Sequence, residues 1–136
     1  MSRPIKFRAW DVFVKEMDYE VTIDPEGKVA AFNPLDGQYV RGFSDDEKVI
    51  MQYTGLKDRN GKEIYEGDVI PPDYALRQNE VAIICYDSNQ ARFKAVPLSL
   101  YKANAGNGGW TGFEVTRHCS IIGNIYENPS LLEDTP

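Results

Sequence analysis

The sequence predicts a mostly-β protein built from short strands and frequent turns. Its composition favours strands over helices, because 12% of the residues are aromatic and the chain contains 11 glycines and 8 prolines. Short apolar segments recur about every 8–12 residues with turn-forming residues between them, a spacing typical of a sandwich or a small barrel. With 136 residues, the chain is long enough for one domain with a substantial core.

The N-terminal region is predicted to contain a strand followed by a hairpin. Apolar and polar residues alternate from Pro4 to Trp10, which indicates a half-buried strand with Arg8 and Trp10 on one face. Residues Tyr19–Ile23 and Lys28–Phe32 are strand-like and flank the type I turn sequence Asp24-Pro25-Glu26-Gly27. We therefore expect these two segments to pair with each other.

A loop over Asn33–Phe43, rich in turn residues, is predicted to follow. We divide the single predicted domain there, into an N-terminal β extension (residues 1–43) and a barrel-like core (residues 44–136). The core begins with the Ser44-x-x-Glu47 spacing of a helix capping box, and one helical turn is expected to lead into a strand over Val49–Thr54.

The stretch from Met51 to Ile70 carries the densest set of structural signals. Asp58-Arg59-Asn60-Gly61 has Asp at the first and Gly at the fourth turn position. In the next turn, Glu66-Gly67-Asp68, we expect Gly67 to adopt a positive φ. The strand that then starts at Val69 is predicted to stop at Pro71, because proline cannot donate to a strand ladder.

The clearest hairpin joins Asn79–Tyr86 to Ala91–Leu98 across a polar turn. A helical turn is one reading of Leu98–Tyr101. The remaining expected elements are a Gly-rich loop over residues 104–109, strands over Trp110–Thr116 and Cys119–Tyr126, and a capped turn over Asn128–Leu132.

The charge and the cysteines restrict the classes of partner and compartment. The net charge of −6 repels phosphate backbones at long range, so any nucleic-acid surface must be a local patch. Two cysteines make neither a disulfide framework nor a metal cage, and Cys85 is expected to be a buried free thiol. The N-terminus lacks the apolar core of a signal peptide and no segment has the apolar length of a membrane span, so we expect a cytoplasmic protein without a membrane partner.

Three separated motifs carry a family resemblance. Ile5–Asp11, Met51–Val69 and Ile122–Pro129 occur in an order that resembles the YopX family, small proteins of phages and prophages in low-GC Gram-positive bacteria. The resemblance implies an SH3-like barrel in the C-terminal half with the N-terminal extension packed on it, and self-association into a homo-oligomer. It implies no catalytic mechanism.

One candidate site is a basic and aromatic patch. Small barrels often bind single-stranded nucleic acid by stacking bases on aromatic side chains beside a cationic groove. The residues that fit this description are Arg8, Trp10, Tyr53, Lys57, Arg59 and Lys62. The alternative is that they pack in the core and rim of a small barrel.

A second candidate is a carboxylate cluster of Glu63, Glu66 and Asp68, with Asp58 nearby. Paired carboxylates can hold a divalent cation or serve as acid and base, but the same residues are also suited to turns and to solvation. His118 and Cys119 are adjacent, and neighbours on a strand point to opposite faces, so they do not form a nucleophile pair.

We therefore predict no catalytic residue, no cofactor and no metal ligand. The predicted function is a non-catalytic binding or assembly module of a phage or prophage, acting through contacts with host or phage proteins and with copies of itself. The alternative is single-stranded nucleic-acid binding through the basic and aromatic patch, and a weaker alternative is a metal-dependent enzyme that uses Glu63, Glu66 and Asp68.

Overall fold

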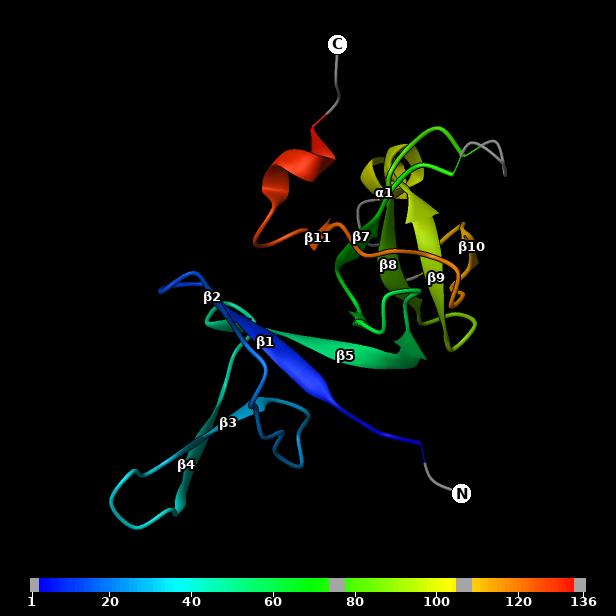
Figure 1. Cartoon of the computed structure of the whole chain (residues 1–136). Coiled ribbons are helices and arrows are strands. Elements are labelled where there is room, and N and C mark those ends of the chain that lie inside the picture. Colours follow the sequence, from blue (N-terminus) through cyan, green and yellow to red (C-terminus); the bar gives the residue numbers. More distant parts are fainter. Residues whose placement is uncertain (1–2, 74–77, 105–108, 134–136) are drawn as a thin grey trace. The chain divides into compact units, whose positions relative to one another are not determined.

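The computed structural model describes residues 3–73, 78–104 and 109–133, and the chain divides into two compact units between Tyr53 and Thr54 (Figure 1). Unit 1 comprises the described residues up to Tyr53, and unit 2 comprises those from Thr54. The fold is mostly β with a curled half-barrel sheet, which confirms the predicted class. The boundary lies inside strand β5 (Lys48–Lys57), whereas the sequence placed its division after Phe43.

Unit 1 contains the predicted first strand, β1 (Phe7–Asp11), which pairs antiparallel with β5. Its other neighbour is β2 (Glu16–Asp18), which was not expected to be a strand. The turn between β1 and β2 holds apolar residues because the Asp11 carboxylate accepts the N–H groups of Phe13 and Val14 at 2.9 and 3.0 Å. A side chain that bonds the backbone in this way specifies a turn whatever the polarity of the residues within it.

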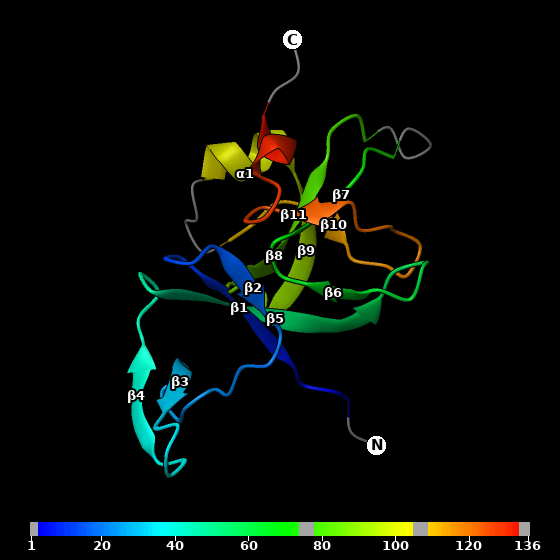
Figure 2. The same cartoon turned by 60° about the vertical axis from the view of Figure 1, so that its left-hand side comes forward.

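The expected pairing of Tyr19–Ile23 with Lys28–Phe32 is wrong except for one isolated bridge, between Ile23 and Val29. Instead β3 (Val29–Phe32) pairs with β4 (Tyr39–Phe43) in a two-stranded ribbon (Figure 2). The loop predicted over residues 33–43 is thus wrong for β4, where β-favouring side chains outweigh the nearby glycines.

Unit 2 contains a five-stranded antiparallel sheet in the order β10-β9-β8-β7-β11, and β6 pairs with β5. The predicted hairpin of β8 and β9 is confirmed, with Ala82 opposite Pro97 and Asp87 opposite Arg92. The elements are β6 (Glu63–Tyr65), β7 (Asp68–Ile70), β8 (Ala82–Asp87), β9 (Arg92–Pro97), α1 (Leu98–Asn104), β10 (Phe113–Glu114), β11 (Gly123–Asn124) and the 3-10 helix η2 (Pro129–Leu132).

Both faces of this sheet are covered. Along β8, Ala82 and Ile84 belong to one buried cluster, and Ile83 and Cys85 belong to the other. This is the period of two that a strand imposes on its side chains. The prediction that Cys85 is a buried free thiol is confirmed.

The last strands are shorter than predicted. Only β10 and β11 form within the expected strands Trp110–Thr116 and Cys119–Tyr126. The chain turns after β11 because the Asn124 side-chain oxygen accepts the N–H groups of Tyr126 and Glu127, which removes both donors from a ladder. Of the predicted Gly-rich loop, residues 105–108 lie outside the described part of the chain. No helix in the described ranges is long and apolar enough to cross a membrane.

Candidate functional site

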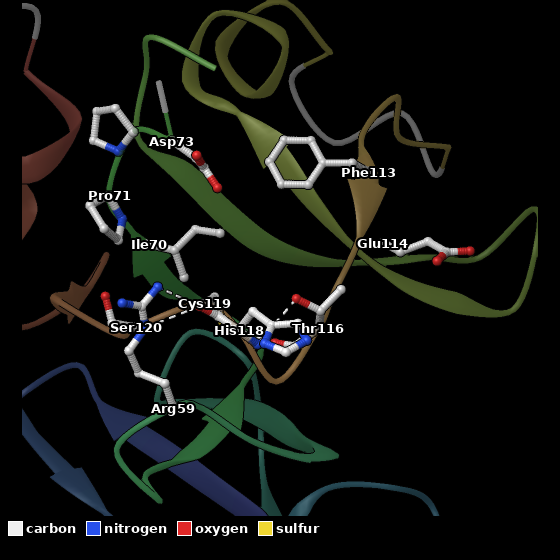
Figure 3. A pocket seen from close by; sticks show the side chains of 11 residues that line it. Arg59, Ile70, Pro71, Asp73, Phe113, Glu114, Thr116, His118, Cys119 and Ser120 are labelled. Atoms are coloured by element: carbon white, nitrogen blue, oxygen red, sulfur yellow. Dashed lines mark hydrogen bonds between the residues drawn. The ribbon is translucent and has the colours of Figure 1, made fainter. Parts of the chain in front are cut away.

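A pocket of about 540 Å³ opens in unit 2 beside the end of β7 (Figure 3). Its apolar wall consists of Ile70, Pro71, Pro72 and Phe113. The two prolines stop β7 as predicted, and they place a wall without N–H donors along one side of the cavity. Pockets that bind small ligands or side chains typically combine such an apolar wall with a few polar groups.

The polar side of the pocket is held by Arg59. Its guanidinium donates through Nε and Nη2 to the His118 carbonyl oxygen at 3.1 and 2.7 Å, and its backbone N–H donates to the Cys119 carbonyl at 3.0 Å. These bonds join the turn after β5 to the segment that precedes β11. Arg59 is thus a structural clamp at the rim of the pocket as well as one of its charges.

The Asp58 carboxylate fixes the same turn from within. Its Oδ1 accepts the N–H groups of Asn60 and Lys62 at 2.8 and 2.9 Å, and its Oδ2 accepts the N–H of Ile121 at 2.9 Å. Burial raises the pKa of this carboxyl, but the three amide donors outweigh burial and the net pKa is lowered. The predicted Asp58–Gly61 turn is confirmed, and the acid in it has a structural role.

Cys119 borders the pocket as a thiol. Its Sγ donates to the Thr116 carbonyl at 3.2 Å, and burial raises the pKa of the thiol with a further increase from the charge of Asp58. Only a thiolate is a strong nucleophile. A Cys119 nucleophile is therefore disfavoured, as the sequence indicated.

The other candidate carboxylates are not gathered into a metal site. Asp68 is buried and accepts the Tyr65 N–H at 2.7 Å, while Glu63 and Glu66 are half-buried. Within residues 3–73, 78–104 and 109–133, no three His, Cys, Asp or Glu side chains are arranged to hold a metal ion. Asp68 therefore stabilises the turn between β6 and β7, which is the alternative to a metal site that the sequence analysis gave for these carboxylates.

The predicted basic and aromatic patch is divided by burial. In unit 1, Arg8 and Tyr53 are buried and Trp10 is half-buried. The Arg8 guanidinium lies over the Tyr19 ring at 5.8 Å, so it packs against an aromatic ring instead of facing solvent as the alternation suggested. In unit 2, the cations of the patch are exposed: Lys57, Arg59 and Lys62. Nucleic-acid binding stays a prediction, now without Arg8 and Tyr53 as accessible groups.

Unit 1 also exposes apolar side chains that the sequence analysis did not select as a site. Leu35 is 94% exposed, Phe13 77% and Val40 60%. Leu35 lies in the β3–β4 turn, Phe13 in the β1–β2 turn and Val40 on β4. The sequence did contain a signal for these positions, namely a large apolar residue flanked by turn-forming residues. A large apolar side chain in an exposed turn is often found where a partner binds.

The family comparison agrees with this architecture. Residues 6–133 match the family model described as YopX protein. The chain belongs to the YopX family. The match covers Met51–Val69, Ile122–Pro129 and all of Ile5–Asp11 except its first residue. The family's proteins are uncharacterised, so membership accounts for the fold and assigns no activity.

Two solved structures are similar to this YopX-family chain. Protein EF1440 from Enterococcus faecalis is 29% identical in sequence, and the match covers 97% of this chain and 100% of that chain with a TM-score of 0.55. Protein YopX from Bacillus subtilis is 18% identical, and the match covers 99% and 100% of the two chains with a TM-score of 0.54. No curated protein matches the chain.

Proposed function

We propose that this YopX-family chain is a non-catalytic binding or assembly module that acts through protein–protein contacts and associates with copies of itself. The observation that carries the proposal is the exposed apolar surface of the β3–β4 ribbon, defined by Phe32, Leu35, Tyr39 and Val40. Several large apolar side chains exposed on one short ribbon are typical of an interaction site.

The tip of the ribbon is held in one conformation. The Leu35 N–H donates to Asn33 Oδ1 at 2.8 Å, the Gly37 N–H donates to the Asn33 carbonyl at 2.8 Å, and the Gln38 N–H donates to Asp36 Oδ1 at 3.0 Å. Leu35 is therefore presented by an ordered turn. A group that is already ordered loses less entropy when a partner binds it.

The ribbon also offers an edge for pairing. In the described residues β4 pairs with β3 alone, and a two-stranded ribbon is marginally stable by itself. A strand from another chain could pair with β4 while apolar side chains pack alongside. Tyr39 and Phe32 stand edge to face at 6.1 Å and would form part of the buried contact.

The size of the effect can be estimated from one side chain. Burying a fully exposed leucine contributes about 1.5–3 kcal/mol, and about 1.4 kcal/mol corresponds to a factor of ten in a dissociation constant. Leu35→Gln should therefore weaken self-association by about tenfold or more. The substitution is at an exposed position, so it should leave the fold unchanged.

Sedimentation equilibrium over a range of protein concentrations tests the proposal. The matched control is Leu100→Gln, which removes an exposed leucine from α1 in unit 2. We expect the wild type and Leu100→Gln to associate alike and Leu35→Gln to shift toward monomer. A wild type that stays monomeric at the highest concentration would remove the self-association part of the proposal.

A second experiment separates the kinds of external partner. The tagged chain is used to capture partners from cells of a lysogenic host, with and without nuclease treatment. Protein partners that survive nuclease and are lost with Leu35→Gln support the module. Capture that depends on intact nucleic acid would favour the alternative function instead.

We further propose that unit 2 is a small barrel of the SH3 type, which its antiparallel meander of short strands and the two short helices of its described residues, α1 and η2, support. The phage or prophage origin and the cytoplasmic location stay predictions from the sequence. A solution structure of unit 2 within the full chain, compared with SH3 barrels strand by strand, tests the barrel.

A further inference from the structure

The turn between β1 and β2 presents consecutive apolar side chains that contribute little to the core. Phe13 is 77% exposed, Val14 is 62% exposed and Val12 is 38% exposed. We call these residues the apolar tip. In both views of the fold, the β1–β2 turn and the turn of the β3–β4 ribbon lie at different ends of unit 1 (Figures 1 and 2). The apolar tip is therefore a surface separate from the ribbon.

The apolar tip is held in one conformation by hydrogen bonds. The Asp11 carboxylate accepts two N–H groups of the tip, and the Asp11 carbonyl accepts the N–H of Lys15 at 2.9 Å. The Val12 N–H donates to the Glu47 carbonyl at 3.0 Å, which fastens the tip to the turn before β5. Because the backbone is already ordered, Phe13 loses less entropy when a partner covers it.

Exposed carboxylates lie in the segments on either side of the apolar tip. Glu16 and Asp18 are in β2, and Asp45 and Asp46 are in the turn before β5. The strand pairing places Glu16 opposite Asp11, and the turn before β5 lies beside the tip through its bond to the tip backbone. We call these exposed carboxylates the acidic collar.

The nearby cations do not balance the acidic collar. Lys48 pairs with Asp11 at 3.6 Å and Arg41 pairs with Glu47 at 2.7 Å, which leaves the exposed Lys15 beside the tip. The field around the tip is therefore negative, like the net charge of −6 of the whole chain. Two copies of the tip would bring like charges together, and so would the tip and a phosphate backbone or an anionic membrane. A basic surface is attracted instead.

We propose that the apolar tip docks into an apolar groove of a partner protein whose rim carries basic side chains. This docking rests on the proposed function and deepens it, because it adds a second surface and the chemistry of the partner that fits it. Phe13 is the anchor, since aromatic side chains that enter a pocket carry a large share of the binding energy at interfaces. The acidic collar steers basic partners to the tip and repels acidic ones.

Nuclear magnetic resonance of the ¹⁵N-labelled full chain tests the proposal with rings that imitate such a groove. The probe is an aminated β-cyclodextrin, whose apolar cavity encloses an aromatic side chain and whose rim carries ammonium groups. The matched probe has carboxylates on the same rim, so the cavity is kept and the charge is reversed. We expect the ammonium ring to shift the amide signals of Phe13, Val14 and Lys15 at a concentration about fivefold or more below that of the carboxylate ring.

Variants assign the two parts of the surface. Phe13→Ser should remove the shifts at the tip, because the cavity loses its occupant, and should leave the rest of the amide spectrum unchanged at this exposed position. Glu16→Gln should reduce the preference for the ammonium ring by about twofold, as expected for one exposed ion pair. Glu133→Gln removes an equal charge from an exposed position in unit 2 and should keep the preference of the wild type.

Three results would overturn the inference. They are equal binding of the two rings at the tip, an absence of shifts at Phe13 and Val14 with either ring, and a preference that Glu16→Gln and Glu133→Gln lower alike. Leu35→Gln, which tests the proposed function, leaves the tip intact and should bind the ammonium ring as the wild type does. A failure at the tip is therefore separate from a failure of self-association through the ribbon.

Discussion

Gly67 has a backbone conformation that residues with a side chain rarely adopt, and two hydrogen bonds hold it there. Its φ is +84°, its N–H donates to the Ile84 carbonyl at 2.8 Å, and its carbonyl accepts the Ile125 N–H at 2.9 Å. The residue is buried, and these two bonds connect it to β8 on one side and to the segment after β11 on the other. Rotation to a negative φ would break both.

The cost of a side chain follows from this geometry. A residue other than glycine in a left-handed conformation costs about 1–2 kcal/mol, and a β-branched residue costs more. We expect Gly67→Val to lower the free energy of unfolding by about 1–3 kcal/mol. Gly67→Asn should cost less, because asparagine enters the left-handed region more readily than valine.

Urea unfolding measures the effect, followed by the fluorescence of Trp110 in a Trp10→Phe background so that the signal comes from unit 2. The control is Gly61→Val, since Gly61 has a similar φ of +83° but is exposed, and a Cβ there would meet no atom within 4 Å. We expect Gly61→Val to be the milder change. An unfolding midpoint of Gly67→Val equal to that of the wild type would refute the assignment of this turn as a rigid scaffold.

Three further predictions concern the ionisable groups. The buried hydrogen bond from Lys94, 2.6 Å long, lowers the pKa of Asp87 from its ordinary 3.8 to about 2, so its stabilising contribution is complete above about pH 4 and is lost as pH falls through 2. Asp87→Asn should therefore be less stable at neutral pH but show a shallower loss of stability in acid by urea titration, and equal slopes would contradict this. Burial raises the pKa of Cys85 to about 12, so iodoacetamide at pH 8 should modify it only after denaturant is added, as mass spectrometry of the digested protein would show. Glu63→Gln should change the free energy of unfolding by less than about 0.5 kcal/mol, because the candidate carboxylate is half-buried on a short strand, and a larger loss of stability would assign it a structural role.

Local patterns in the sequence determined much of unit 2. The β8–β9 hairpin, the turns at Asp58 and Gly67 and the burial of Cys85 all follow from residues close together in the chain. Strand alternation and turn chemistry act over a few residues, so they can be recognised without knowledge of the partner. The family resemblance, carried by three motifs, was confirmed over residues 6–133.

The tertiary structure alone decided which segments pair and which side chains are covered. The alternation of the first strand predicted that Arg8 faces solvent, but packing against Tyr19 buries it. In the same way, the pairing of β3 with β4 replaced the equally plausible hairpin that the sequence predicted between Tyr19–Ile23 and Lys28–Phe32. The pocket depends on two hydrogen bonds, one from the Ile121 N–H to the Asp58 carboxylate and one from the Arg59 guanidinium to the His118 carbonyl, which join residues 63 and 59 positions apart. Contacts at such separations are selected by competition among all surfaces of the folded chain, which no local pattern encodes.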